Sequence, residues 1–109
     1  MLSKQFRLNL RKESDFFQKC KKAHTPYFSF FFVPSNEFKA TVIVSKKIAT
    51  KASQRNAIKR KFRSAVTANL DFLTKLKINL AIVVHEKGAD LSVSEITQQI
   101  QENAEKIRI

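Results

Sequence analysis

The stretch SKKIATKASQRNAIKRKFR, residues 45–63, carries eight lysine and arginine side chains among nineteen residues. No acidic residue occurs between Glu37 and Asp71 to balance them. Such a density of like charge repels itself, and folding does not require it. A polyanion, of which RNA and DNA are the common examples, is therefore the expected partner of this stretch.

The surrounding segment, from Ala52 to about Thr74, is predicted to form the main helix, with Ser53 as its cap. Apolar side chains recur there at helical spacing and would face the core: Ile58, Phe62, Ala65, Val66 and Leu73. At about 100° per residue, polar and basic side chains share an arc beside that stripe: Asn56, Lys59, Arg60 and Arg63. Arg55 falls at the edge of the apolar stripe, and Lys61 falls outside the arc. One side of the helix suits a core, and the adjoining side suits anions.

The composition is that of a single globular domain spanning residues 1–109. Hydrophobic residues make up 43% of the chain and ten residues are phenylalanine, which is not typical of a disordered basic tail. Residues 1–70 hold 16 basic and 3 acidic side chains, whereas residues 71–109 hold 5 and 6. The net charge of +12 therefore belongs to the first two thirds of the fold, as expected if one side faces phosphates.

Residues 1–12 are charged throughout, and we interpret them as a basic N-terminal arm and not as a secretion signal. No apolar run is long enough to span a bilayer, so no membrane partner is expected. Cys20 is the only cysteine, which excludes an internal disulfide and suits a reducing compartment. These observations predict a cytoplasmic protein.

Three elements are predicted before the main helix. A short helix is expected over residues 15–22, with Phe16 and Cys20 on its apolar face. Residues 27–33, YFSFFFV, and residues 38–45 are predicted strands. The connection between these strands is short and rich in turn residues, so we expect an antiparallel hairpin.

Alternation divides the first of these strands into two apolar faces. One face is predicted to carry Phe28, Phe30 and Phe32. The other face is predicted to carry Tyr27, Ser29, Phe31 and Val33. Aromatic side chains beside a positive field can stack the bases of single-stranded nucleic acid, and Phe16 could oppose them. A strand this rich in phenylalanine can also be simply part of the core, and the first of the two faces is expected to be so.

After the main helix, residues 78–85 form a nearly continuous apolar run that predicts a central strand. Ser92 and Glu95 form a capping box that opens a last helix. The buried stripe of that helix is predicted to hold Ile96, Ile100, Ala104 and Ile107. The order helix, strand, strand, helix, strand, helix predicts an α+β fold, a single small sandwich with helices against one sheet.

A solvated surface is the simplest alternative for a run of charge, but balancing acids are missing here, which favours nucleic acid. A helix-turn-helix DNA reader fits poorly with this order of elements, and we expect no DNA partner. Catalysis by the chain itself has little support. His85 and Glu86 are neighbours on a strand and so point to opposite faces, and no group of residues has metal-ligand spacing. We therefore expect neither catalytic nor metal-binding residues.

A family resemblance rests on three motifs in order: Ser45-Lys46-Lys47-Ile48, then residues 55–60 (Arg-Asn-Ala-Ile-Lys-Arg), then Arg63. This series resembles the signature of the bacterial ribonuclease P protein subunit, and the resemblance extends over nearly the whole chain. Phe16 matches a phenylalanine of the family's first helix, and residues 83–88 resemble its last strand and loop. The sequence departs from the family pattern at Ala57, Ser64 and Cys20.

The resemblance implies a fold like ribosomal protein S5 domain 2, with an unusual left-handed βαβ crossover where the general rule favours a right-handed one. It implies that the chain binds the catalytic RNA through Lys46, Lys47, Lys51, Arg55, Asn56, Lys59, Arg60 and Arg63. It also implies a cleft for the 5′ leader of precursor tRNA, to which we assign Phe16, Tyr27 and Phe31. The partners would be ribonuclease P RNA and precursor tRNA.

The function implied is that of a subunit of an endoribonuclease that matures tRNA 5′ ends, with the chemistry and its Mg²⁺ ions belonging to the RNA. The chain would supply position and electrostatics. A non-enzymatic RNA-binding module, such as a small ribosomal or ribosome-assembly protein, is the main alternative. A nuclease made of protein alone is a third, disfavoured because carboxylates are scarce in the basic region.

Overall fold

Strand β4 (Ile78–Val84) lies at the centre of the structure, a computed structural model that describes residues 7–8 and 20–104. It pairs antiparallel with β2 (Phe28–Pro34) on one side and parallel with β3 (Lys39–Ile43) on the other. Five of its seven residues are buried, including Ala81 on the second face of the sheet, and Asn79 and Val83 are half-buried, in keeping with its apolar sequence. The predicted central strand and the α+β class are confirmed.

The expected hairpin between residues 27–33 and 38–45 is wrong, because β4 is inserted between the two strands. The order in the sheet is β1-β2-β4-β3. Had β2 and β3 paired directly, β4 would lie at an edge with an unpaired backbone. Placing the most apolar strand in the middle gives it hydrogen-bonded neighbours on both sides and avoids an exposed apolar edge.

A further short strand, β1 (Lys21–His24), pairs antiparallel with β2 and forms the edge of the sheet. The predicted helix over residues 15–22 is therefore wrong at its C-terminal end, where Lys21 and Lys22 belong to β1. Residues 15–19, which include Phe16, lie outside the described residues. The turn after β1 is held by the Thr25 hydroxyl, which donates to the carbonyl of Phe28 at 2.9 Å and accepts from its N–H at 3.1 Å. Two exposed lysines suit an edge strand.

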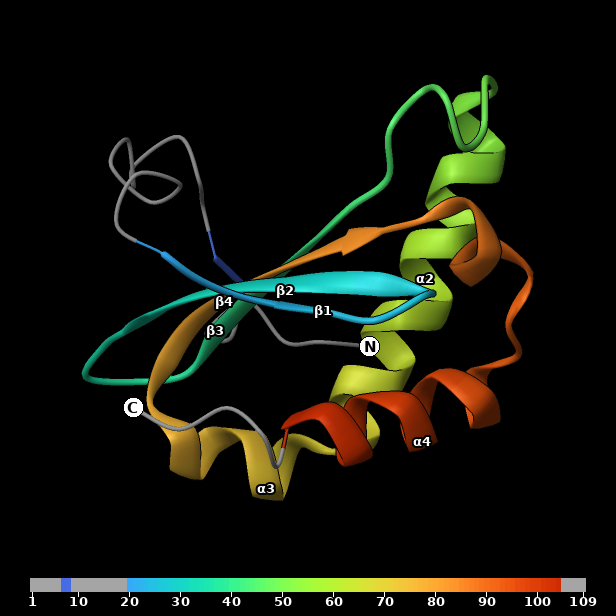
Figure 1. Ribbon diagram of the computed structural model, residues 1–109. Helices are drawn as coiled ribbons and strands as arrows, with labels where there is room; N and C mark the ends of the chain where they lie inside the picture. The colour runs from blue at the N-terminus through green and yellow to red at the C-terminus, as the bar shows by residue number, and fades with distance from the viewer. Residues whose placement is uncertain (1–6, 9–19, 105–109) are drawn as a thin grey trace.

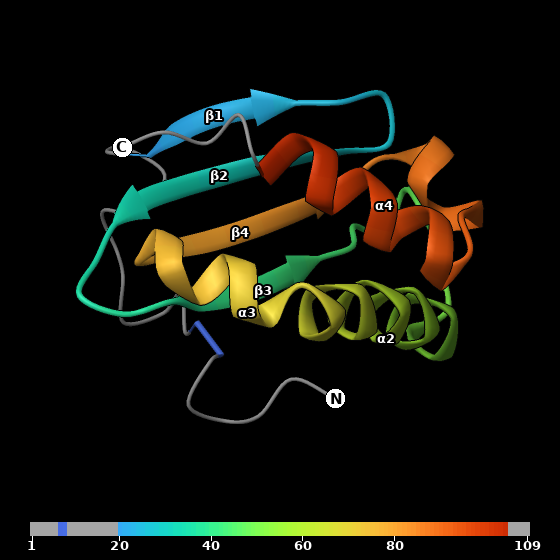
Figure 2. The ribbon, with the colours of Figure 1, turned by 90° about the horizontal axis from the view of Figure 1, so that it is seen from below.

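The main helix, α2 (Ala52–Ala68), connects the parallel strands β3 and β4. In Figure 2 the helices lie toward the viewer and both strands point to the right. If the strands are turned to point upward, β4 lies to the left of β3, so the crossover is left-handed, as the resemblance implied. A right-handed crossover would have moved β4 away from β2, to the outer side of β3.

Helix α2 ends earlier than predicted, and a short turn of helix, α3 (Leu70–Leu73), and the 3₁₀ turn η2 (Thr74–Leu76) follow it. Asn69 separates them. Its buried side chain donates to the carbonyls of Ala65 and Thr97, both at 3.1 Å. These bonds satisfy the amide in the core at the point where α2 ends. The predicted Ser53 cap is also wrong, since the N-cap residue is Lys51 and no side chain caps the helix.

The helices of the described residues lie on one face of the sheet (Figure 1), where the larger of two hydrophobic clusters forms. Phe62 of α2 is fully buried there and meets Phe28 of β2 edge-on, with ring centroids 5.7 Å apart. After the 3₁₀ turn η3 (Glu86–Asp90), helix α4 (Val93–Ala104) packs beside α2. Its three buried residues in the described range, Ile96, Ile100 and Ala104, were predicted; Ile107 lies outside that range.

The predicted capping box at the start of α4 is confirmed. The backbone N–H of Glu95 donates to the Ser92 hydroxyl, and the N–H of Ser92 donates to the Glu95 carboxylate, each at 3.2 Å. This reciprocal pair satisfies two backbone donors that the helix leaves open.

The only glycine, Gly88, allows η3 to approach the turn between β1 and β2. A Cβ atom at this position would lie 2.1 Å from the backbone oxygen of Tyr27, which itself accepts the N–H of His85 at 3.0 Å. We predict that Gly88→Ala lowers the free energy of unfolding by about 1–3 kcal/mol, because the backbone must shift to remove the overlap. Urea unfolding measures this, with the exposed substitution Ser94→Ala as the control. An unchanged unfolding midpoint for Gly88→Ala would contradict the close approach.

Candidate nucleic-acid interface

Helix α2 presents its polar and basic side chains along the flank next to its buried stripe. Lys59 and Arg63 are half-buried along this flank, and Asn56 and Arg60 are exposed farther round the helix. Lys46 and Lys47 are exposed in the turn that precedes the helix. We call these six residues the basic surface.

The basic surface has no acidic partner within the described residues: none of its lysines and arginines forms an ion pair there. The ion pair recorded among the described residues, Lys39 with Glu37 at 3.3 Å, joins the first residue of β3 to the turn before it. An array of cations without internal compensation is typical of a surface that binds phosphates.

Arg55 differs from the rest, because its guanidinium folds back onto the chain. Its Nη1 donates to the carbonyl of Ala49 at 3.0 Å and to that of Thr50 at 2.9 Å. These bonds join the first turn of α2 to the loop that carries Lys46 and Lys47. Arg55 was predicted to contact RNA; the structure gives its side chain a role in positioning that loop.

Lys61 projects from the other flank of α2, away from the basic surface. Its ammonium group donates to the carbonyls of Ala89 and Leu91, at 2.8 and 2.9 Å, and so holds the connection between η3 and α4. Lys61 is therefore engaged with the protein's own backbone and is not part of the basic surface. Lys51, at the N-cap of α2, is exposed.

A pocket of about 130 Å³ lies where α2 meets the outer edge of the sheet. Arg63 and Val66 of α2 line it on one side, and Arg7 and Leu8 line it on another, with three residues of β3 between them. Arg7 and Leu8 are held against β3 by a bridge to Ala40, whose carbonyl accepts the Leu8 N–H at 2.9 Å. Arg7 was predicted only as part of the basic N-terminal arm; in the structure it lines the same pocket as Arg63 of the basic surface.

The face of the sheet opposite the helices carries a smaller hydrophobic cluster. Its partly buried members include Phe31, Val33 and Cys20, packed against buried Ala81. The Lys22 ammonium lies 5.8 Å from the centroid of the Phe31 ring. We call this the open face because none of the helices of the described residues lies on it. An aromatic ring and a cation are thus placed together there, which is the combination that stacks and tracks single-stranded nucleic acid.

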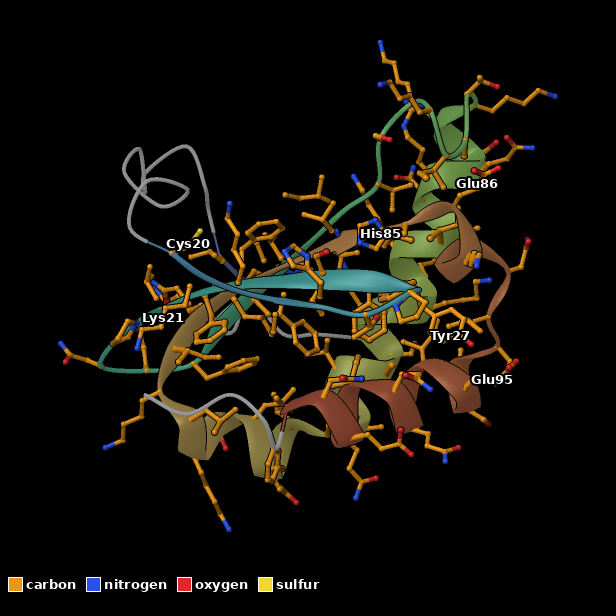
Figure 3. The ribbon with its side chains drawn as sticks, in the orientation of Figure 1. Cys20, Lys21, Tyr27, His85, Glu86 and Glu95 are labelled. Carbon is orange, nitrogen blue, oxygen red and sulfur yellow. The ribbon has the colours of Figure 1, made fainter. Side chains whose placement is uncertain are left out.

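Tyr27 was predicted to share this open face with Phe31, and it does not. It packs against the helix-side cluster, and in Figure 3 it lies below the sheet toward α4, whereas Cys20 and His85 lie above the sheet. Alternation fails at this residue because Tyr27 belongs to the turn that precedes β2 and not to the strand. Of the three predicted cleft residues, the structure places only Phe31 on the open face; Phe16 is not described.

The open face also holds a hydrogen-bonded chain that the sequence did not indicate. His24 Nδ1 and His85 Nε2 each lie 2.7 Å from the hydroxyl oxygen of Ser29. Ser29 is 1% exposed. The His24 ring meets Phe31 edge-on at 6.1 Å. Alternation could have suggested that His24 shares a strand face with Lys22, but it could not bring His85 from 56 residues away.

Arg55 gives a test that separates positioning of the loop from contact with a ligand. We predict that Arg55→Ala lowers the free energy of unfolding by about 1–3 kcal/mol, because two carbonyls lose a charged donor. It should also speed hydrogen exchange at Ile48 and Ala49, whose N–H groups donate to Ser45 in the same loop. The matched control is Arg60→Ala, which should change stability by less than about 0.5 kcal/mol and leave exchange unaltered. Equal effects of the two changes would contradict the positioning role.

The described residues contain no group of three or more histidine, cysteine, aspartate or glutamate side chains placed to hold a metal ion. None of their helices combines the length and apolar character that crossing a bilayer would need.

Known proteins with the same fold also bear on this surface. A family model described as Ribonuclease P matches residues 2–108. No curated protein sequence matches at a significant level. The RNase P protein of Thermotoga maritima is similar in structure, with a TM-score of 0.83, 19% identity, and coverage of 94% of this chain and 98% of that one.

A second solved structure, the RNase P protein of Staphylococcus aureus, is similar with a TM-score of 0.77 and 17% identity, covering 93% of this chain and 94% of that one. At these identities the structural matches establish the shared fold. The family model spans almost the full length of the sequence, including the basic surface and all four strands of the sheet. The chain therefore belongs to the ribonuclease P protein family.

Proposed function

We propose that this chain binds the catalytic RNA of ribonuclease P through its basic surface and the 5′ leader of precursor tRNA on the open face of the sheet. The ribonucleoprotein then removes the leader by endonucleolytic cleavage. The observation that carries this proposal is the separation of two different surfaces. One is cationic with no internal acidic partner; the other combines Phe31 with Lys22 and two histidines.

The basic surface suits a folded RNA. Exposed Arg60 can offer its planar guanidinium to a phosphate or a base edge, and Lys46 and Lys47 supply point charges to the backbone. Phe62, buried beneath α2, holds the helix against the sheet, so these side chains project from a rigid support. Arg55 fixes the lysine-bearing loop relative to that helix. A preordered array loses less conformational entropy on binding than a flexible tail.

The open face suits a single strand. Phe31 offers an aromatic surface for a base, and the Lys22 ammonium beside it offers charge for the backbone. The helices lie on the other face and leave this side of the sheet free of α2, α3 and α4 (Figure 1). Because the two surfaces are on different sides of the molecule, one protein can hold the catalytic RNA and the leader at once.

The protein's own residues supply binding and orientation, and we assign the hydrolysis and its Mg²⁺ ions to the RNA subunit. The carboxylates of the described residues are not gathered as a two-metal nuclease would need. Holding the leader on the sheet while α2 holds the RNA would raise the effective concentration of the cleavage site, without any protein group taking part in the chemistry.

Reconstitution tests the proposal directly. The protein is combined with a bacterial ribonuclease P RNA, and cleavage of precursor tRNA is followed at low Mg²⁺ concentration. We expect the protein to stimulate cleavage, because its cations reduce the repulsion between the two RNAs. An absence of stimulation would instead favour a non-enzymatic RNA-binding module. Cleavage without the RNA subunit would show that the chemistry belongs to the protein.

Two substitutions test whether the surfaces are distinct. Arg60→Ala should weaken binding to the RNA subunit and lower the slope of log affinity against log salt by about one. Phe31→Ala should weaken binding of leader-bearing substrates by about 1–3 kcal/mol per stacked base and leave a leaderless tRNA unaffected. Filter binding to each RNA measures both effects, and indistinguishable profiles would rule out two surfaces.

A further inference from the structure

The hydrogen-bonded chain of His24, Ser29 and His85 is the most unusual polar feature outside the basic surface. It joins β1, β2 and the end of β4 across the open face of the sheet. The bridging hydroxyl is 1% exposed, while His24 is exposed and His85 half-buried. Within the described residues, the Ser29 hydroxyl bonds only to these two rings. Their outer nitrogens, Nε2 of His24 and Nδ1 of His85, have no hydrogen-bond partner there.

Counting hydrogens determines what this chain presents to solvent. The Ser29 hydroxyl has one hydrogen, so it donates to one inner ring nitrogen and accepts from the other. With both rings neutral, the two imidazoles must then be the same tautomer, both Nε2–H or both Nδ1–H, because His24 bonds through Nδ1 and His85 through Nε2. One outer nitrogen carries a hydrogen, and the other outer nitrogen is a bare acceptor.

The chain can accept one proton without losing a bond. The proton goes to the bare outer nitrogen, the inner bonds to Ser29 stay as they were, and both outer nitrogens become donors. A second proton would have to go to the remaining inner nitrogen, so that two N–H groups would face the Ser29 oxygen. Its buried hydrogen would be left without an acceptor, and two like charges would share one hydroxyl.

The charged and ionisable groups on the surrounding elements make this place favourable for an anion. Those in the described residues are Cys20, Lys21 and Lys22 on and before β1, Tyr27 in the turn, Lys39 on β3, Lys46 and Lys47 after β3, and Glu86 beside His85. Lys39 is paired with Glu37 and lies opposite Asn79, at the other end of the sheet, so the lysine that bears on this place is Lys22, which extends over the same open face as His24.

We propose that the His24–Ser29–His85 chain is a proton-linked binding site for a phosphate of the single-stranded leader. The singly protonated chain offers two N–H donors and one positive charge, which is the complement of a backbone phosphodiester. Histidine is the side chain that changes charge between about pH 5 and pH 8, so the linkage falls in an accessible range. This inference rests on the proposed leader-binding function of the open face.

Linkage determines the sign of the effect. A bound phosphate stabilises the imidazolium form, so binding takes up a proton, and protonation in turn strengthens binding. The leader's contribution to affinity should therefore grow as the pH falls. One linked proton changes an association constant by at most about tenfold per pH unit, and a second should not be taken up.

The experiment uses the holoenzyme reconstituted with ribonuclease P RNA. Dissociation constants are measured from pH 5.5 to 8 for precursor tRNA with a non-cleavable linkage at the processing site, and for the same tRNA without its leader. The dissociation constant of the leaderless tRNA, divided by that of the leader-bearing precursor, isolates the leader's contribution and cancels titration of the rest of the RNA. We expect this ratio to rise toward low pH, approaching tenfold per unit at most.

Neutral replacements identify the protonated groups. His24→Asn and His85→Gln each put an amide nitrogen near the place of the ring nitrogen that bonds Ser29, so the chain survives without its charge. Each should flatten the pH dependence of the ratio. Ser29→Ala removes the bridge and should lower the ratio at pH 6, while the exposed control Ser94→Ala should behave as the unaltered protein.

The outcomes separate this inference from the function on which it rests. No effect of the leader at any pH would overturn the proposed leader-binding function. A leader effect that does not vary with pH, or that varies with pH in both histidine variants as it does in the unaltered protein, would overturn the proton-linked site and leave the leader-binding function standing.

Discussion

Strand β4 must lie between β2 and β3 and beneath the helices, and this is the constraint on which the rest of the structure depends. Its apolar run, INLAIVV, is stable only between two other strands and beneath a layer of helices. To reach that place, the chain leaves β3 through α2 and returns on the side of β2. The left-handed crossover follows from this insertion, and so does the position of α2 along the β3 side of the sheet.

That position of α2 determines which of its charged residues are available to a ligand. The basic run looks uniform in the sequence, but its members have different roles in the structure. Arg55 and Lys61 satisfy backbone carbonyls at two ends of the fold, one before the helix and one before α4. Lys59, Arg60 and Arg63 remain on the flank between them. Two cations of the basic run therefore hold the connections that shape the basic surface.

Because α2, α3 and α4 all lie on one side, the two faces of the sheet differ in chemistry within the described residues. The helix side is filled by Phe28, Phe30 and Phe62, which meet ring against ring. The open side has a smaller apolar cluster, with Phe31 beside Lys22, and a buried serine that joins two histidines. A buried hydroxyl is stable only when it is hydrogen-bonded. Ser29 meets this need by bonding to His24 and His85, and so it links β2 to β1 and to the end of β4. The aromatic, cationic and imidazole groups of this face would have been excluded by a larger apolar core.

Periodicity and local chemistry in the sequence by themselves determined the buried stripe of α2, the apolar character of β4 and the capping box of Ser92 with Glu95. Each of these depends on residues within a turn or two of one another. The strand order, the end of α2 at Asn69 and the placement of Tyr27 were decided only in the tertiary structure. The same is true of the carbonyl partners of Lys61, 28 and 30 residues away, and of the contact between Ser29 and His85 across 56 residues. These depend on which strands become neighbours and in what register, and that choice is made by burying β4 as a whole, which no short stretch of sequence encodes.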